Sequence, residues 1–443
     1  MKKPVYRSFI GKSENGGIIN EEKLIVVSLS SEKNWNTLSD RIVPHYEKVL
    51  SQKLPTIFEE IAKQAAKFQN DIDVINAVTS LLSEKIQYMG DLRSISGGWL
   101  PRDLEQIASS TIGDCKDMSS SAGAILRSLG FKVNSALVAR GSDIHPNYIR
   151  LPSLGAFNHV FLKVTAKDGS VYWIEPTHDI SMAQTPFEDT AGKMALVLDT
   201  QSPSYERVSY IDYENAVSFT EKNITLLSES RALYDIELSL QGASASRYTA
   251  TALYFSNDVI KDGLTTRFSR KSLNKNDIKY VELPDLKSRI VQDLLFKFSF
   301  NTTNAFYKTN FGLGMNLEYL YDLEELFKNS EERVTDILMT PRTTIQKTLL
   351  KGMVVPNTES LNFNASNDWF DLSRNISHSS NGTEVLTKLV MKHAIIPSEF
   401  IATEEFQELR NDYLENFSDS FLLVEPQIHL DQCSMVDQCG IAL

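Results

Sequence analysis

The spacing of apolar residues in this chain changes abruptly near residue 130. Before that point apolar residues recur at helical intervals, most clearly in segment 70–89. After it, short runs rich in β-branched and aromatic residues alternate as strands do. Helices followed by an antiparallel sheet indicate an α+β fold. The predicted strands are 131–140, 157–166 and 170–177.

Three further segments of the first half carry clear signals. Residues 23–29 (KLIVVSL) have strand character. Residues 31–50 predict a helix that bends or restarts at Pro44, because proline lacks the amide donor. Residues 55–68 predict another helix, with Pro55 suited to its first turn.

From about residue 205 the chain has mostly strand character. Segment 243–264 predicts a helix, and 397–417 predicts a closing helix. Asn381-Gly382 is a strong hairpin signal. The predicted strands of this half are 233–242, 294–313, 343–355 and 368–396.

The charge balance narrows the classes of partner. The formal net charge is -12, which argues against a general nucleic-acid or anionic-membrane binder, since either needs a basic face. No stretch approaches the ~20 apolar residues of a membrane span, and the start of the chain lacks the apolar run of a secretory signal. We expect a cytoplasmic protein as sequenced, or a periplasmic or secreted one if the chain is truncated.

The chain has only three cysteines, too few for a disulfide framework. Cys433 and Cys439 lie close together in the tail, where they could pair, bind a metal weakly or do neither. No further thiol or histidine is placed to complete a zinc site, and we expect no metal or organic cofactor. Cys115 differs, because it lies between two acidic residues at the predicted start of an amphipathic helix, 115–129.

A cysteine is a useful nucleophile as the thiolate, and the N-terminal end of a helix favours that charge. Cys115 lies where this effect is largest. The negative charge of Asp114 disfavours a thiolate at Cys115 unless the Asp114 carboxylate caps the helix. Asp117 is expected to cap N–H groups of the first turn, and Lys116 to face solvent.

A thiol nucleophile needs a base, and His159 is the best candidate among seven histidines. It lies in mid-strand, where a buried polar residue needs a partner. A hairpin between strands 157–166 and 170–177 brings Glu175 beside it, as in the third position of a catalytic triad. Asp179 is the alternative for that role.

Other residues near these segments are ambiguous. Trp99, in the loop GGWLPRD, could wall a substrate groove or donate its indole N–H near an oxyanion, although a core position explains it more simply. His145 and His178 lie close to the predicted site in sequence, with no partner evident for either.

Three short segments resemble those of a known family. GDCKD (113–117), FNH (157–159) and YWIEPT (172–177) are similar to the catalytic segments of transglutaminase-like domains, members of the papain-like cysteine enzyme superfamily. The resemblance is closest to a bacterial subgroup in which β-rich domains flank the catalytic unit. It covers about residues 30–200.

The resemblance implies a role for each candidate: Cys115 as nucleophile, His159 as general base and Glu175 as orienting carboxylate. The chain departs from the family at the third position, where the family usually has Asp. Glu is one methylene longer, and carboxylates of either length support triads on other folds.

This resemblance also suggests how the chain is divided. Residues 1–30 form a short strand segment, interpreted as the remnant of an N-terminal β domain. A transglutaminase-like catalytic domain spans 31–204, and a β-rich domain and a tail follow at 205–430 and 431–443.

Two functions follow from these patterns. The first is cysteine-dependent acyl transfer or hydrolysis on a peptide or protein substrate, with a peptidase or amidase slightly favoured over a transglutaminase. The second is a transglutaminase-like module that has lost its chemistry and binds a protein or polysaccharide.

Overall fold

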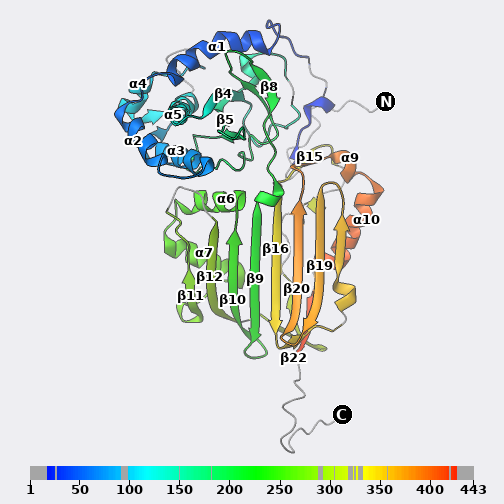
Figure 1. The fold of residues 1–443 in the computed structure, drawn as a ribbon. Helices are drawn as coiled ribbons and strands as arrows, with labels where there is room; N and C mark the ends of the chain where they lie inside the picture. Colours follow the sequence, from blue (N-terminus) through cyan, green and yellow to red (C-terminus); the bar gives the residue numbers. More distant parts are fainter. Residues whose placement is uncertain are drawn as a thin grey trace, which may run out of the picture.

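The structure is a computed structural model, and the described part of the chain forms two stacked halves (Figure 1). The N-terminal half combines helices with a five-stranded sheet, and the C-terminal half is built on an eight-stranded sheet. The α+β class and the β-rich second half are therefore confirmed. The described residues are 17–24, 27–90, 98–148, 150–180, 182–287, 293–303, 305–317, 323, 326–327, 333–356, 358–418 and 421–426.

The helices of the N-terminal half begin at recognisable signals. Asn34 and Asn70 cap α1 and α3 through their side-chain oxygens. Pro55 precedes α2, whereas Pro44 lies inside α1 without ending it. The helices are α1 (Trp35–Leu50), α2 (Thr56–Ala65), α3 (Asp71–Lys85), α4 (Leu104–Ser110) and α5 (Cys115–Ser128).

Helices α1 and α5 pack against the five-stranded sheet, which is antiparallel throughout. Gly123 lets α5 approach α1 closely, because a Cβ there would lie 2.6 Å from Leu50 Cδ2. This contact sets the position of α5 over the sheet. From edge to edge the strands are β6 (Val171–Ile174), β5 (His159–Thr165), β4 (Lys132–Val138), β7 (Met194–Val197) and β8 (Ser204–Arg207).

The large sheet is antiparallel except at its centre, where β9 and β16 run parallel. The strands that flank this pair continue the sheet outward on both sides (Figure 1). From edge to edge they are β11 (Ile278–Glu282), β12 (Leu294–Thr303), β10 (Arg231–Leu240), β9 (Val217–Leu226), β16 (Arg342–Lys351), β20 (Gly382–Met391), β19 (Phe370–Ser379) and β18 (Phe363–Ser366).

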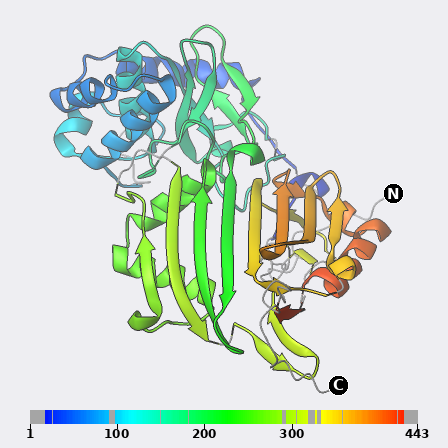
Figure 2. The same ribbon diagram turned by 60° about the horizontal axis from the view of Figure 1, so that its bottom comes forward.

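Helices cover one face of the large sheet in two groups (Figure 2). Helices α6 (Ala243–Ala252) and α7 (Asn257–Ser269) share an apolar cluster with β10 and β12. Helices α9 (Ser398–Ile401) and α10 (Glu404–Tyr413) share another with β19 and β20. Each group buries the apolar stripe of its strands, which stabilises both halves of the sheet.

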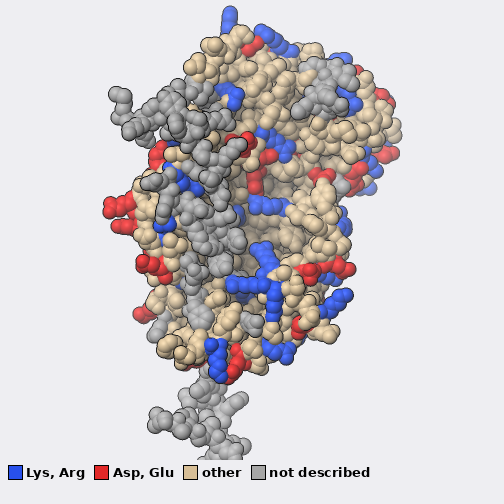
Figure 3. Space-filling model, turned by 180° about the vertical axis from the view of Figure 1, so that it is seen from behind, with Lys and Arg blue, Asp and Glu red and all other residues tan. Residues whose placement is uncertain are grey.

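The opposite face of the large sheet is polar. Cross-strand ion pairs join Lys297 to Glu237 at 2.9 Å, and Lys347 to Glu221 and Glu384 at 3.5 and 3.4 Å. Such pairs are typical of a solvated sheet face. On the other side of the molecule, which carries the helices, Lys and Arg side chains gather in a central hollow, while Asp and Glu lie mostly toward the margins (Figure 3).

Three small sheets complete the described strands. The first links the start of the chain to the C-terminal half, because its strand β1 pairs with β15. The strands are β1 (Gly17–Ile18), β15 (Asp336–Leu338) and β21 (Ile395–Ile396); β2 (Gln87–Tyr88) and β3 (Ile112–Gly113); and β13 (Tyr307–Thr309), β14 (Gly312–Asn316), β22 (Phe421–Pro426) and β17 (Met353–Val354).

Several predicted elements are wrong in detail. The strand predicted at 23–29 is absent from its described part: Glu21–Lys23 is a 3₁₀ turn, and 27–29 belong to no strand, with Val27 85% exposed. An apolar run becomes a strand only where a partner strand packs against it. Helix α4 was not predicted.

The two predicted helices of the C-terminal half are each divided. Segment 243–264 contains α6 and the first part of α7, because Ser256 starts α7 by accepting from the Val259 amide. Segment 397–417 contains α9, α10 and a π-helical end, with Thr403 capping α10. The domain bounds given above stay a prediction.

The predicted hairpin at Asn381-Gly382 exists, with its turn one residue earlier. Ser379 pairs with Gly382, so Ser380 and Asn381 form the two-residue turn. Gly382 opens β20 with φ 131°, and a Cβ there would lie 2.0 Å from the Leu350 carbonyl oxygen. Glycine is required both by this backbone conformation and by the close approach of β16.

Asp336 joins three distant segments of the chain. Its Oδ1 lies 2.7 Å from Lys23 Nζ and its Oδ2 lies 3.2 Å from His145 Nε2. The amide and hydroxyl of Ser398 donate to Oδ1 at 2.9 and 3.1 Å. Burial disfavours the carboxylate, but the hydrogen bonds from His145 and Lys23 outweigh it and hold the pKa of Asp336 well below its usual range.

We expect Asp336→Ala to lower the free energy of unfolding by about 3–5 kcal/mol, because it leaves buried partners uncompensated. Urea unfolding of both proteins measures the loss. The matched control is Glu229→Ala, which breaks an exposed pair with Lys308 and should cost no more than ~1 kcal/mol. Equal losses in the two variants would show that Asp336 is not a structural hub.

Candidate active site

Cys115 is the first residue of α5, and a capping box fixes that start. Asp114 Oδ1 accepts from the amides of Lys116 and Asp117 at 3.0 and 3.3 Å, and the Asp114 amide donates to Asp117 Oδ2 at 3.5 Å. Arg102 holds Asp117 in turn, with its amide 3.0 Å from Oδ1 and its Nε 2.8 Å from Oδ2. Both carboxylates therefore cap the helix, as the sequence predicts.

His159 opens β5, close to the start of α5. The Ser119 hydroxyl, one turn beyond Cys115, donates to the Val160 carbonyl at 3.0 Å and ties the helix to the strand. The imidazole of His159 is buried, and the nearby thiol of Cys115, which is half-buried, contributes to raising the pKa of His159. The structure thus brings the first two candidate residues together.

Glu175 directly follows β6 and completes the group. The strand register sets it opposite Phe161, so it reaches His159 along a diagonal of the sheet. Its Oε2 lies 2.6 Å from His159 Nε2, and both side chains are buried. Its Oε1 accepts from the amide and hydroxyl of Thr177 at 3.1 and 2.6 Å.

The buried His159–Glu175 pair favours opposite charges on its two members. Burial lowers the pKa of His159, but Glu175 and the hydrogen bond with Cys115 outweigh it and raise the pKa to about 9. Burial raises the pKa of Glu175, but His159 and Arg140 outweigh it and lower the pKa to about 2. A charged imidazole and a carboxylate therefore coexist near neutral pH.

Sequence reasoning missed two residues beside this pair. Arg140 Nη1 lies 3.5 Å from both Glu175 Oε2 and His159 Nε2. Tyr88 pairs with Gly113 across β2 and β3, and burial together with the nearby thiol raises the pKa of Tyr88. Arg140 ended a predicted strand and Tyr88 ended a predicted helix, so neither position carried a signal of its own.

A mostly polar pocket of about 650 Å³ opens beside the site. Tyr88 and Met118 line it on one side, and His178 lines it on the other. Tyr254 reaches it from the C-terminal half and donates a hydrogen bond to Asp179 Oδ2. Asp179, the alternative partner of His159, is therefore bonded to Tyr254 in the wall of this pocket instead.

Trp99 is partly buried against an apolar cluster that includes Leu137 and Val160, with Cys115 also packed on it. The Trp99 carbonyl accepts from the Tyr46 hydroxyl at 2.7 Å. This placement agrees with a core position. A role of the Trp99 indole in substrate binding stays a prediction.

Two expectations about single residues are wrong. Lys116 does not face solvent: it is 6% exposed and forms an ion pair with Asp114, which draws it inward. His145 and His178 both have partners, in Asp336 and Arg140. His145 and His178 lie outside the helices and strands, so no periodic pattern describes their contacts.

The remaining expectations concern metals, membranes and the tail. Cys433 and Cys439 lie outside the described residues. Within the described ranges no group of three or more His, Cys, Asp or Glu side chains is arranged to hold a metal ion. No helix in the same ranges combines the length and apolar character needed to cross a membrane.

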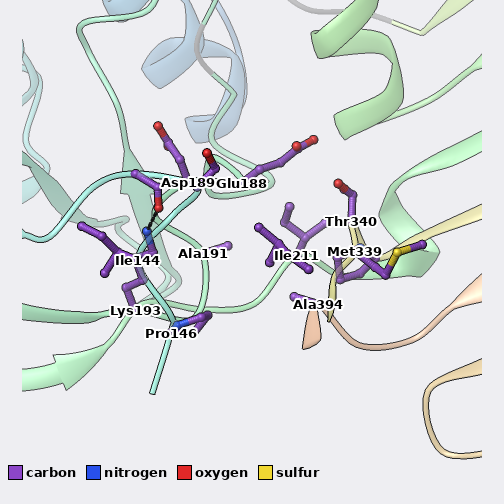
Figure 4. Close-up of a pocket in the computed structure, with 14 residues that line it drawn as sticks. Ile144, Pro146, Glu188, Asp189, Ala191, Lys193, Ile211, Met339, Thr340 and Ala394 are labelled. Atoms are coloured by element: carbon purple, nitrogen blue, oxygen red, sulfur yellow. Dashed lines mark hydrogen bonds between the residues drawn. The ribbon is translucent and has the colours of Figure 1, made fainter. Parts of the chain in front are cut away.

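A separate, apolar cavity of about 130 Å³ lies where the two halves meet (Figure 4). Lys193 is buried in its wall and donates to the Gly141 carbonyl, and burial lowers the pKa of Lys193 to about 8. Residues of both halves line the cavity, among them Ile144, Asp189, Ala191, Met339, Thr340 and Ala394.

Comparisons with known proteins found a weak similarity to a solved structure. No family model matches the chain, and no curated protein matches it. A crystal structure described as a "putative protease", from Parabacteroides distasonis, matches 87% of this chain at 10% identity with a TM-score of 0.49. The match spans 58% of the length of that protein. At this identity and score, the likeness says nothing about the activity of this chain.

The His159–Glu175 pair should stabilise the fold most between pH 4.5 and 6.5. The contribution of His159 is full below its ordinary pKa of 6.5 and is lost as pH rises through about 9. The contribution of Glu175 is full above its ordinary pKa of 4.5 and is lost as pH falls through about 2.

We therefore expect the loss of unfolding free energy in Glu175→Gln to peak in that window and to shrink on both sides. Urea unfolding of the two proteins across pH measures it. Glu229→Gln, at an exposed pair with Lys308, is the control and should show a small, flat difference. A large loss that does not vary with pH would contradict the charged pair.

Proposed function

We propose that this chain is a cysteine-dependent acyl-transfer enzyme that acts on peptide or amide bonds. Cys115 is the nucleophile, His159 the general base and Glu175 the orienting carboxylate. The observation that carries the proposal is the buried 2.6 Å contact between His159 and Glu175, beside a cysteine at a capped helix start. The resemblance to transglutaminase-like domains supports the same roles and the same fold.

The orientation of the imidazole sets the order of proton transfer. Glu175 holds Nε2 of His159, which leaves Nδ1 for the thiol. The proton of Cys115 first passes to His159, and Sγ then attacks the carbonyl carbon as the thiolate. His159 then protonates the departing amine as the C–N bond breaks, leaving a thioester. An acceptor deprotonated by His159 attacks the thioester and releases the acyl group.

The start of α5 also supplies a donor for the oxyanion. The amides of Lys116 and Asp117 are taken by Asp114. The Cys115 amide makes no hydrogen bond to any of the described residues, so it is available to the developing charge. A donor of this kind typically contributes ~3 kcal/mol to the transition state.

Water is the favoured acceptor. It is always present, and no sequence feature marks a site for a second, amine substrate. The polar pocket lined by Thr177 and His178 has a volume of about 650 Å³, enough for a peptide side chain, and Thr177 connects it to Glu175. The proposal is therefore a peptidase or amidase, and no metal or organic cofactor takes part in it.

The alternative, a binding module without chemistry, rested on Glu in place of the usual Asp. Glu175 nevertheless reaches His159 at 2.6 Å, because its longer side chain spans the diagonal of the sheet. The substitution alone therefore does not argue for lost activity. The nucleophilicity of Cys115 distinguishes the two functions.

We expect Cys115 to react rapidly with iodoacetamide near neutral pH, because transfer of the thiol proton to His159 leaves a nucleophilic thiolate. The rate is measured across pH in a Cys433→Ser/Cys439→Ser background. His159→Ala should slow it by at least tenfold near neutral pH. His45→Ala, at an exposed position on α1, is the control and should leave it unchanged. Slow alkylation that follows an ordinary thiol titration would favour the binding module.

A second measurement separates the acceptors. We expect fluorescein-labelled casein to be cleaved, with little incorporation of dansylcadaverine, and Cys115→Ala to abolish both reactions. Dominant amine incorporation would instead assign a transglutaminase. Turnover that persists in Cys115→Ala would refute the cysteine mechanism.

A further inference from the structure

Arg140 is fastened to the strand that carries His159. It lies two residues beyond β4, and its backbone bonds the side chain of Asn158, the residue that precedes His159. The Arg140 amide donates to Asn158 Oδ1 at 2.7 Å, and Asn158 Nδ2 donates to the Arg140 carbonyl at 2.7 Å. These two bonds continue the pairing of β4 and β5 past its last backbone pair, Val138 with His159. The backbone of Arg140 is thereby fixed relative to His159.

The guanidinium of Arg140 directs its donors at several acceptors around Glu175. Nη1 donates to Thr177 Oγ1 at 3.1 Å and lies 3.5 Å from Glu175 Oε2. Nε donates to Asp189 Oδ2 at 2.5 Å, and Nη2 contacts His178 Nε2. The planar fork therefore holds both carboxylates and one histidine in a fixed arrangement.

This arrangement determines the protonation of two histidines. Arginine can only donate, so His178 Nε2 must accept and His178 must be neutral. Burial lowers the pKa of His178, and Arg140 lowers it further against the opposing charge of Glu175. Arg140 Nη1 also lies 3.5 Å from His159 Nε2, and arginine cannot accept a proton from it. The Nε2 proton is therefore directed to Glu175.

We propose that Arg140 is a positioning residue for the His159–Glu175 pair, an inference that rests on the proposed function for its catalytic meaning. Its charge keeps Glu175 ionised and opposes positive charge on His159. Without Arg140, a buried carboxylate 2.6 Å from the imidazole would hold the imidazolium more tightly. The proton needed by the leaving amine would then be released less readily.

The carboxylate of Asp189 partly neutralises the charge of Arg140. It accepts from Arg140 Nε and lies on the segment that leads to β7. Removing Arg140 takes a cation away from His159, whereas neutralising Asp189 leaves that cation less compensated. The two changes should therefore shift the titration of His159 in opposite directions. The titratable groups that face His159 and Arg140 are Glu175, Cys115, Tyr88, His178, Asp189 and Lys193.

The test uses the full chain in a Cys115→Ala background, so that the thiol does not contribute. Histidine labelled with ¹³C at Cε1 is titrated by NMR, and the His159 signal is assigned by its loss in His159→Gln. We expect Arg140→Met to raise the pKa of His159 by about one unit, and Asp189→Asn to lower it. General loss of structure does not produce shifts of opposite sign.

Two matched variants complete the test. Arg140→Lys keeps the positive charge, so the pKa of His159 should stay close to its value in the protein with Arg140. Arg127→Met removes an ion pair with Glu47 that is held by two 2.7 Å hydrogen bonds. It should lower the stability of the fold and leave the pKa of His159 unchanged.

An unchanged His159 titration in Arg140→Met, or shifts of the same sign in Arg140→Met and Asp189→Asn, would overturn the proposal. If Arg140→Met does not fold, the isosteric Asp189→Asn decides alone, with an unchanged or raised pKa refuting the proposal. The readout does not depend on turnover, so its failure is distinct from failure of the proposed enzyme, which Cys115 alkylation tests.

Discussion

The carboxylates of Asp114 and Asp117 decide where α5 begins, and the candidate site depends on that start. Without this cap the first turn of α5 would fray, and the direction of the Cys115 side chain would no longer be fixed. Arg102 holds Asp117 in the cap, and Ser119 bonds the next turn to Val160. A short hydrogen-bonded network thus turns a local sequence, GDCKD, into a fixed direction for one thiol.

The grouping of Cys115, His159 and Glu175 could be predicted because each depends on local signals. A capping pair marks a helix start, alternation marks a strand, and a short connection makes two strands neighbours. The surroundings of the group could not be predicted. Arg140 is positioned by the side chain of Asn158, and Asp189 meets it from a loop. Neither contact leaves a periodic trace in the sequence.

The errors in the fold have the same origin. KLIVVSL is apolar enough for a strand, but strand formation depends on a distant partner that the run itself does not specify. Lys116 has the character of a surface residue, yet the cap formed by Asp114 attracts its ammonium group and buries it. In the first case a distant partner strand is missing for the described residues 27–29 of the run, and in the second a neighbouring carboxylate outweighs the usual preference of lysine for the surface.

The contacts of Asp336 bear on how the protein is made. Lys23 and Ser398, which share this carboxylate, are separated by 375 positions. Synthesis proceeds from the N-terminus, so Lys23 and His145 leave the ribosome long before their common acceptor. The N-terminal half, which ends with β8, therefore lacks this contact until Asp336 has been synthesised. Docking of the halves, and with it the pocket wall supplied by Tyr254, is among the last events of biosynthesis.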